Sequence, residues 1–132
     1  MGEARIIDSS GLKLAGYLAR PSPSAAKGAG RYGLILCHGF PAVPGGATIT
    51  GGTYSQLADR LAADAGWVVL TFNFRGTGAS EGDFSLGGWL TDLQAAIDHM
   101  LAIEGVEAIW VCGFSVGGAI GICAAGEDER VR

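Results

Sequence analysis

The chain has 132 residues, which is the length of one ordinary domain. Hydrophobic residues make up 48% and charged residues 17%, so the chain can build a packed core and is not a disordered tail. The formal net charge is −4 with the two signs interspersed, which argues against the basic stripe of a nucleic-acid-binding protein.

The N-terminal sequence and the cysteines favour a reducing compartment. The first ten residues carry an early acid and no apolar core of a signal peptide, and no apolar run is long enough for a membrane span. Cys37, Cys112 and Cys123 form no Cys-x-x-Cys pair, and each has apolar neighbours, which is typical of buried thiols. We therefore expect a soluble, cytoplasmic protein with no membrane partner.

The first third of the chain predicts a hairpin followed by a buried strand. Residues 4–9 and 12–21 alternate partly and flank a serine–glycine turn, which favours an antiparallel hairpin at a sheet edge. Residues 21–30 are rich in proline, serine and glycine and predict a surface connection. The apolar run at 32–37 is typical of a strand buried on both faces, and residues 38–52 predict a long loop of the kind that is usually functional.

Helices and strands alternate in the remainder. Apolar residues at helical spacing predict helices over residues 54–65, 89–103 and 116–125, and Gly66 is expected to end the first. Apolar runs at 67–74 and 108–113 predict two further buried strands, and residues 75–88 predict a second long loop. The order predicts an α/β fold with a mainly parallel sheet, an N-terminal antiparallel hairpin and flanking helices.

A serine between glycines follows the last predicted strand. Gly113-Phe114-Ser115-Val116-Gly117 matches G-x-S-x-G with a strand before it and a helix after it. A sharp turn there holds the serine in a strained conformation with its hydroxyl above the sheet, and glycine avoids collisions on either side. The new helix directs the Val116 N–H at the same point, which suits a developing oxyanion. The alternative is that Ser115 merely caps the helix.

Three segments carry a family resemblance. LILCHGF at 34–40, VVLTFNFRGTGASEG at 68–82 and WVCGFSVGG at 110–118 have the order and spacing of motifs in the α/β-hydrolase superfamily. Over about residues 12–125 the chain resembles the N-terminal half of that fold, and most closely its small esterases and serine-peptidase-like hydrolases.

The resemblance implies roles for individual residues. It makes Ser115 the nucleophile and the backbone N–H of Phe40 the second donor of the oxyanion hole, beside that of Val116. His38 and Gly39 are then expected to support the loop that carries Phe40. The loop that contains Arg75 is expected to buttress the serine turn.

The expected base and acid for the serine are missing. Hydrolysis by a serine nucleophile usually needs a histidine as the base, oriented by a carboxylate. In this superfamily both residues follow the serine in the chain. No histidine follows Ser115, and the acids at 127–129 come directly after the helix. His38 ends a strand, and His99 is expected on the solvent face of its helix. We therefore expect residues 1–132 to be an incomplete domain. A complementary C-terminal half, as a second chain or a missing segment, would pair with the strand at 108–113 and supply both groups.

The favoured interpretation is a serine hydrolase that acts by acyl transfer on a small substrate, with a carboxylic ester preferred. Amides, thioesters and short peptides remain open, and no cofactor or metal is expected. One alternative is a non-catalytic or truncated hydrolase-like module. A dinucleotide-binding domain is the least supported, because Glu81 occupies the third glycine position after Gly76 and Gly78.

Overall fold

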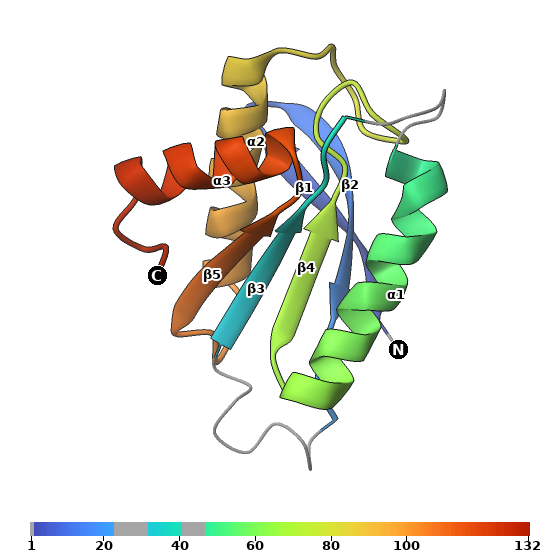
Figure 1. The fold of residues 1–132 in the computed structure, drawn as a ribbon, viewed down its shortest axis with the longest axis vertical. Helices are drawn as coiled ribbons and strands as arrows, with labels where there is room; N and C mark the ends of the chain where they lie inside the picture. The colour runs from blue at the N-terminus through green and yellow to red at the C-terminus, as the bar shows by residue number, and fades with distance from the viewer. Residues whose placement is uncertain (1, 23–31, 41–46) are drawn as a thin grey trace.

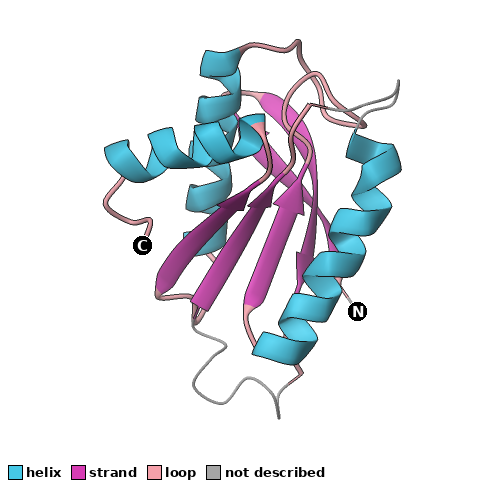
Figure 2. Ribbon diagram, viewed as in Figure 1, coloured by secondary structure: helices cyan, strands magenta, loops and turns pink. Residues whose placement is uncertain are grey.

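The computed structural model describes residues 2–22, 32–40 and 47–132, and the side chains of the first helix from residue 54 onward. The described residues form five strands and three helices, shown in Figures 1 and 2. In chain order they are β1 (Glu3–Ser9), β2 (Leu12–Ala19), β3 (Tyr32–Cys37), α1 (Ala47–Ala65), β4 (Val68–Phe72), α2 (Leu86–Leu101), β5 (Ala108–Gly113) and α3 (Val116–Glu127).

The strands form one mixed sheet in the order β1-β2-β4-β3-β5. β1 and β2 are an antiparallel hairpin, β2 joins β4 antiparallel, and β3 lies parallel to both β4 and β5. The predicted α/β class, the edge hairpin and the parallel remainder are confirmed. Because β3, β4 and β5 are parallel, the segments that follow them emerge at the same end of the sheet (Figure 1).

The helices cover the two faces of the sheet unequally. α1 packs on one face, over β2 and β4, whereas α2 and α3 pack on the other face (Figure 2). The larger core lies beneath α2 and α3, and its largest fully buried side chains include Trp89, Phe74, Leu93 and Ile109. No helix of the described residues is long and apolar enough to cross a membrane.

Two helices begin earlier than their apolar spacing predicts. α1 begins at Ala47, so residues 47–52 of the predicted loop are helical, and α2 begins at Leu86 instead of Trp89. Glycine is a poor helix former, and each of these segments contains a pair of glycines. The sequence pattern therefore did not predict the first turns of the two helices. Ser85 caps α2, since its Oγ accepts a 2.9 Å hydrogen bond from the Gly88 N–H. Residues 41–46 of the predicted 38–52 loop, and residues 23–30 of the predicted 21–30 connection, lie outside the described residues.

β5 is less buried than predicted. Ile109 is fully buried beneath the helices, but Trp110 and Cys112 are exposed on the α1 face. These side chains are exposed because β5 is an edge strand of the sheet and α1 covers β2 and β4, not β5. The expectation of three buried thiols is also wrong, because Cys37 is buried whereas Cys112 and Cys123 are exposed.

The open edge of β5 already carries the beginning of a further pairing. Val131 forms an isolated parallel bridge to Ile109, and the Arg132 N–H donates to the Ile109 carbonyl at 2.8 Å. This bridge lies on the side of β5 opposite to β3, at the end of the chain that follows α3. The edge of β5 is therefore geometrically able to accept a parallel neighbour.

Neighbouring isoleucines of β1 test the placement of the core. Ile7 is 1% exposed and Ile6 is 63% exposed, since successive side chains of a strand point to opposite faces. We expect Ile7→Ala to lower the free energy of unfolding by about 2–5 kcal/mol, because it leaves a cavity. Ile6→Ala should change it by at most about 0.5 kcal/mol. Chemical denaturation measures both, and equal losses would show that β1 does not present Ile7 to the core.

Candidate active site

The turn between β5 and α3 holds Ser115 in an unusual backbone conformation. Ser115 has φ 56° and ψ −121°, in the left-handed region that side-chain-bearing residues rarely adopt. Such a conformation costs on the order of 1–3 kcal/mol and persists only where the surroundings impose it. Here the Phe114 N–H donates to the Cys37 carbonyl at 3.0 Å, and the Gly118 N–H donates to the Ser115 carbonyl at 2.9 Å.

Glycines make this turn possible on both sides of the serine. A Cβ atom on Gly117 would collide with the carbonyl oxygens of His38 and Cys37, at the end of β3. A Cβ atom on Gly113 would collide with the backbone of Gly117 and Gly118, within the turn itself. The predicted need for glycine at both positions is therefore met, although only the second glycine faces the neighbouring strand.

The Ser115 hydroxyl is not used as a helix cap. Ser115 occupies the position before α3, yet its side chain makes no capping hydrogen bond, unlike that of Ser85 before α2. The side chain is exposed at the sheet end. Val116 is the first residue of α3, and the N–H of such a residue has no partner within its own helix. The arrangement thus places a solvent-accessible hydroxyl beside the positive end of a helix.

The segment after β3 lies against this turn. A Cβ atom on Gly39 would sit 2.9 Å from both the Ser115 Cβ and the Phe114 carbonyl oxygen, so the two backbones touch. Phe40 follows directly, and its side chain is 57% exposed. The fold therefore brings together the two segments, 38–40 and 113–117, from which both oxyanion donors were predicted.

His38 is buried and engaged by its neighbours. Its Nε2 accepts a 3.1 Å hydrogen bond from the Phe74 N–H, so Nδ1 carries the proton and donates to the Gly39 carbonyl at 2.6 Å. Burial lowers the pKa of His38, which keeps the ring neutral. With both nitrogens occupied, the ring links the ends of β3 and β4.

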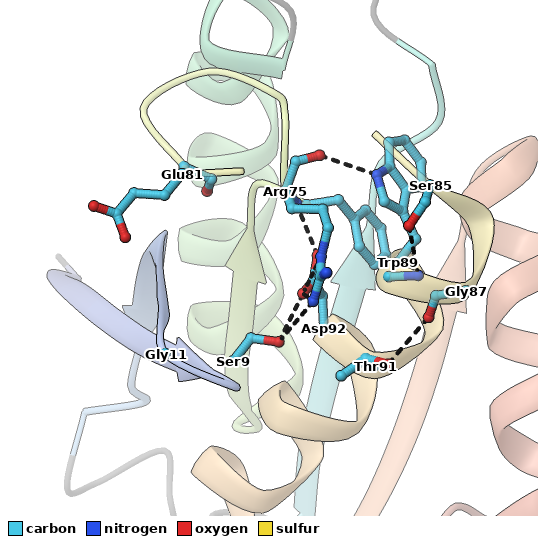
Figure 3. A network of polar contacts seen from close by, with 12 residues as sticks. Ser9, Gly11, Arg75, Glu81, Ser85, Gly87, Trp89, Thr91 and Asp92 are labelled. Carbon is cyan, nitrogen blue, oxygen red and sulfur yellow. Dashed lines mark hydrogen bonds and ion pairs between the residues drawn. The ribbon is translucent and has the colours of Figure 1, made fainter. Parts of the chain in front are cut away.

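An ion pair between the buried Asp92 and the partly buried Arg75 fixes the loop after β4, and Asp92 was not predicted (Figure 3). Asp92 of α2 is fully buried; its carboxylate accepts hydrogen bonds from the Arg75 N–H at 2.8 Å, from Arg75 Nη2 at 2.9 Å and from Ser9 Oγ at 2.7 Å. A buried carboxylate requires such partners. The signal was present in the sequence, because Asp92 falls within the apolar stripe of its helix.

Trp89 joins the same loop to the segment after β3. Its indole N–H donates to the Arg75 carbonyl at 3.1 Å (Figure 3), and its ring stacks on Phe74 with centroids 4.4 Å apart. The His38 ring contacts the edge of Trp89 at 5.4 Å. The first turns of α2 thus support His38, and through it the loop that touches Ser115.

His99 does not face solvent as predicted. It is half-buried on α2, and its pKa is lowered by burial and then by the charge of Arg5 on β1. The prediction placed His99 by its angle around the helix from Leu90. The buried Asp92 lies seven positions before His99, which is an angle of only about 20° around the helix, so both residues lie on the same side. His99 also lies about 15 Å along α2 from Trp89, which contacts the His38 ring. It is therefore not placed to act on Ser115.

The acids after α3 are equally remote. Asp128 ends α3 and forms a 2.6 Å ion pair with Arg130, whose hydrogen bonds lower the pKa of Asp128. Ser115 lies at the opposite end of this 12-residue helix, about 18 Å away along its axis. Within the described ranges no histidine or carboxylate is positioned as the base or acid of a serine triad.

The loop after β4 lacks the geometry of a dinucleotide site. Gly76 and Gly78 have φ of 78° and 51°, but α2 begins only at Leu86 and not directly after them. The intervening residues are held against the hairpin, since the Glu81 N–H donates to the Lys13 carbonyl at 3.0 Å. The loop is a support for neighbouring strands and does not cradle a phosphate at a helix start.

Comparison with known proteins agrees with this architecture. Residues 34–132 match the family described as serine aminopeptidase, S33, and the chain belongs to this family, within the α/β-hydrolase superfamily. No match was found among curated proteins.

Solved structures give the same fold. A serine hydrolase without a lid from Xanthomonas campestris is 28% identical with a TM-score of 0.80, over 98% of this chain and 57% of that one. Est1E from Butyrivibrio proteoclasticus, solved with ferulic acid, is 26% identical with a TM-score of 0.77, and the match covers 96% of this chain and 49% of Est1E. An esterase from Pyrococcus furiosus shares the fold, at 22% identity and a TM-score of 0.76, and the match covers 99% of this chain and 49% of that esterase. The chain thus spans about half the length of these proteins.

Two glycines of α3 test the contact between the serine turn and β3. Gly117→Ala places a methyl group against the carbonyls of Cys37 and His38, so we expect a loss of several kcal/mol in the free energy of unfolding. Gly126→Ala on the same helix meets nothing within 4 Å and should be neutral or stabilising by up to about 1 kcal/mol. Thermal and denaturant unfolding compare the two, and a tolerated Gly117→Ala would contradict the close approach.

Proposed function

We propose that this chain carries the nucleophilic half of a serine hydrolase active site. The observation that carries the proposal is the left-handed backbone of Ser115, imposed between glycines at the start of α3. Ser115 Oγ attacks the substrate carbonyl carbon and loses its proton to a base. The Phe40 and Val116 N–H groups then bind the oxyanion. The leaving group departs with a proton, and water hydrolyses the acyl-serine in the second step.

The base and its orienting acid come, in this proposal, from a complementary C-terminal part of the fold. Three observations support it. Both ring nitrogens of His38 are hydrogen-bonded to other groups, and His99 lies far along α2. The edge of β5 is open beyond the bridge of Val131 to Ile109, and the similar structures are about twice as long. A parallel strand added at that edge would extend the sheet past Ser115. Its loops would then emerge at the same end as the serine.

Carboxylic esters are the substrates that we favour. A similar structure is described as an esterase, and Est1E was solved with ferulic acid, a carboxylic acid. A peptide amide is the second candidate, because the matching family is described as a serine aminopeptidase. The two differ in the leaving group, since an amine must be protonated before it departs whereas an alcohol is a better leaving group.

Covalent labelling tests the assignment of the nucleophile. We expect a fluorophosphonate to label the protein stoichiometrically when the complementary C-terminal half is present, as a second chain or a further segment, and labelling to vanish in Ser115→Ala. Ser55→Ala, in α1, is the control and should label as the wild type does. Residues 1–132 alone should label far more slowly, because neither of the described histidines, His38 and His99, is available to the serine as a base.

The outcomes separate the candidate functions. Labelling with hydrolysis of p-nitrophenyl esters but not of aminoacyl p-nitroanilides supports an esterase, and the reverse supports an aminopeptidase. Absence of labelling in the presence of the complementary C-terminal half would favour a non-catalytic module. Full activity of residues 1–132 by themselves would refute the complementary half.

A further inference from the structure

Three large apolar side chains are exposed at the end of the sheet that carries Ser115. Phe40 follows β3, Phe84 lies in the loop after β4, and Leu86 begins α2; they are 57%, 47% and 57% exposed. We call these three residues the aromatic shelf. Exposed apolar groups gathered from separate segments mark binding surfaces more often than single exposed residues do.

The two phenylalanines of the shelf are packed together and are not free side chains. The Phe40 and Phe84 rings contact each other with centroids 5.0 Å apart. Both also rest on the Trp89 ring, at 5.5 and 5.2 Å. Trp89 is fully buried and hydrogen-bonded to the Arg75 carbonyl, so it is a fixed support on which the two half-exposed rings pack.

The backbone beneath the shelf is fixed as well. Gly76, at φ 78°, lets the loop fold onto itself, since a Cβ atom there would sit 2.7 Å from the Phe84 nitrogen. The Gly76 N–H donates to the Glu81 carbonyl at 3.2 Å, and Ser85 caps α2 directly after Phe84. A surface ordered before binding loses little conformational freedom when a ligand packs on it.

The shelf begins one residue from the serine turn. The position of a Cβ atom on Gly39 is 2.9 Å from the Ser115 Cβ, and Phe40 is the next residue. In the proposed function the Phe40 N–H binds the substrate carbonyl oxygen. The Phe40 side chain and the rest of the shelf then lie beside that carbonyl, within reach of the group attached to it.

We infer that the aromatic shelf binds the acyl group of the substrate, and that this group is apolar: an aromatic ring or an alkyl chain of several carbons. The inference rests on the proposed function and adds the class of acyl group. The three shelf side chains offer only apolar contacts, so a short or charged acyl group would gain little there.

The test uses this chain together with the proposed complementary half and two p-nitrophenyl esters, acetate and octanoate, which share a leaving group. We expect a kcat/KM that favours octanoate. Phe84→Ala should lower the octanoate-to-acetate ratio of kcat/KM about tenfold. Phe84→Leu and Leu86→Ser should lower it less. Ile6→Ala removes an equally exposed apolar side chain from β1, away from the shelf, and should leave the ratio unchanged.

Each result decides the inference. An unchanged ratio in folded Phe84→Ala and Leu86→Ser, with hydrolysis still dependent on Ser115, overturns the shelf as an acyl site and leaves the proposed function standing. Should Phe84→Ala fail to fold, Phe84→Leu and Leu86→Ser decide by the same ratio. A wild type that hydrolyses neither ester overturns the shelf as an acyl site, and it overturns the proposed function as well only if the fluorophosphonate does not label Ser115.

Discussion

The close approach of α3 to the end of β3 is the contact on which the candidate site depends. Gly117 packs its backbone directly against the carbonyls of Cys37 and His38, where no side chain fits. The Phe114 N–H donates to the Cys37 carbonyl at 3.0 Å, which joins the two strand ends. One contact therefore sets the strained turn at Ser115 and places the segment that follows β3 beside it. Both proposed oxyanion donors depend on this arrangement.

The support behind that contact is polar and buried. Asp92 holds the loop after β4 through Arg75, Trp89 donates to the same loop, and His38 accepts from the Phe74 N–H. A buried ion pair adds little net stability relative to apolar packing, but loss of one partner is costly because the other charge stays buried. We interpret the network as a device that selects one conformation of the two loops, which a site with fixed backbone donors requires.

Much of this architecture was predictable from local sequence. The strands at 32–37 and 108–113 were predicted to the residue, because each is an apolar run bounded by a glycine or a loop. The turn at Ser115 was predictable because its stereochemistry demands particular residues. The early start of α1, the partner of Arg75, the face of His99 and the exposure of β5 depend on packing between distant segments. Local periodicity carries little information about such packing.

The account joins a preorganised serine and two backbone donors in this chain to a base and an acid supplied from elsewhere in the fold. Its central claim is tested most directly by a crystal structure of this chain together with the proposed complementary half, after reaction with an alkyl phosphonate. The account predicts phosphorus bonded to Ser115 Oγ and a phosphoryl oxygen about 3 Å from the Phe40 and Val116 nitrogens. Phosphorus on another residue, or a phosphoryl oxygen directed away from both nitrogens, would contradict it.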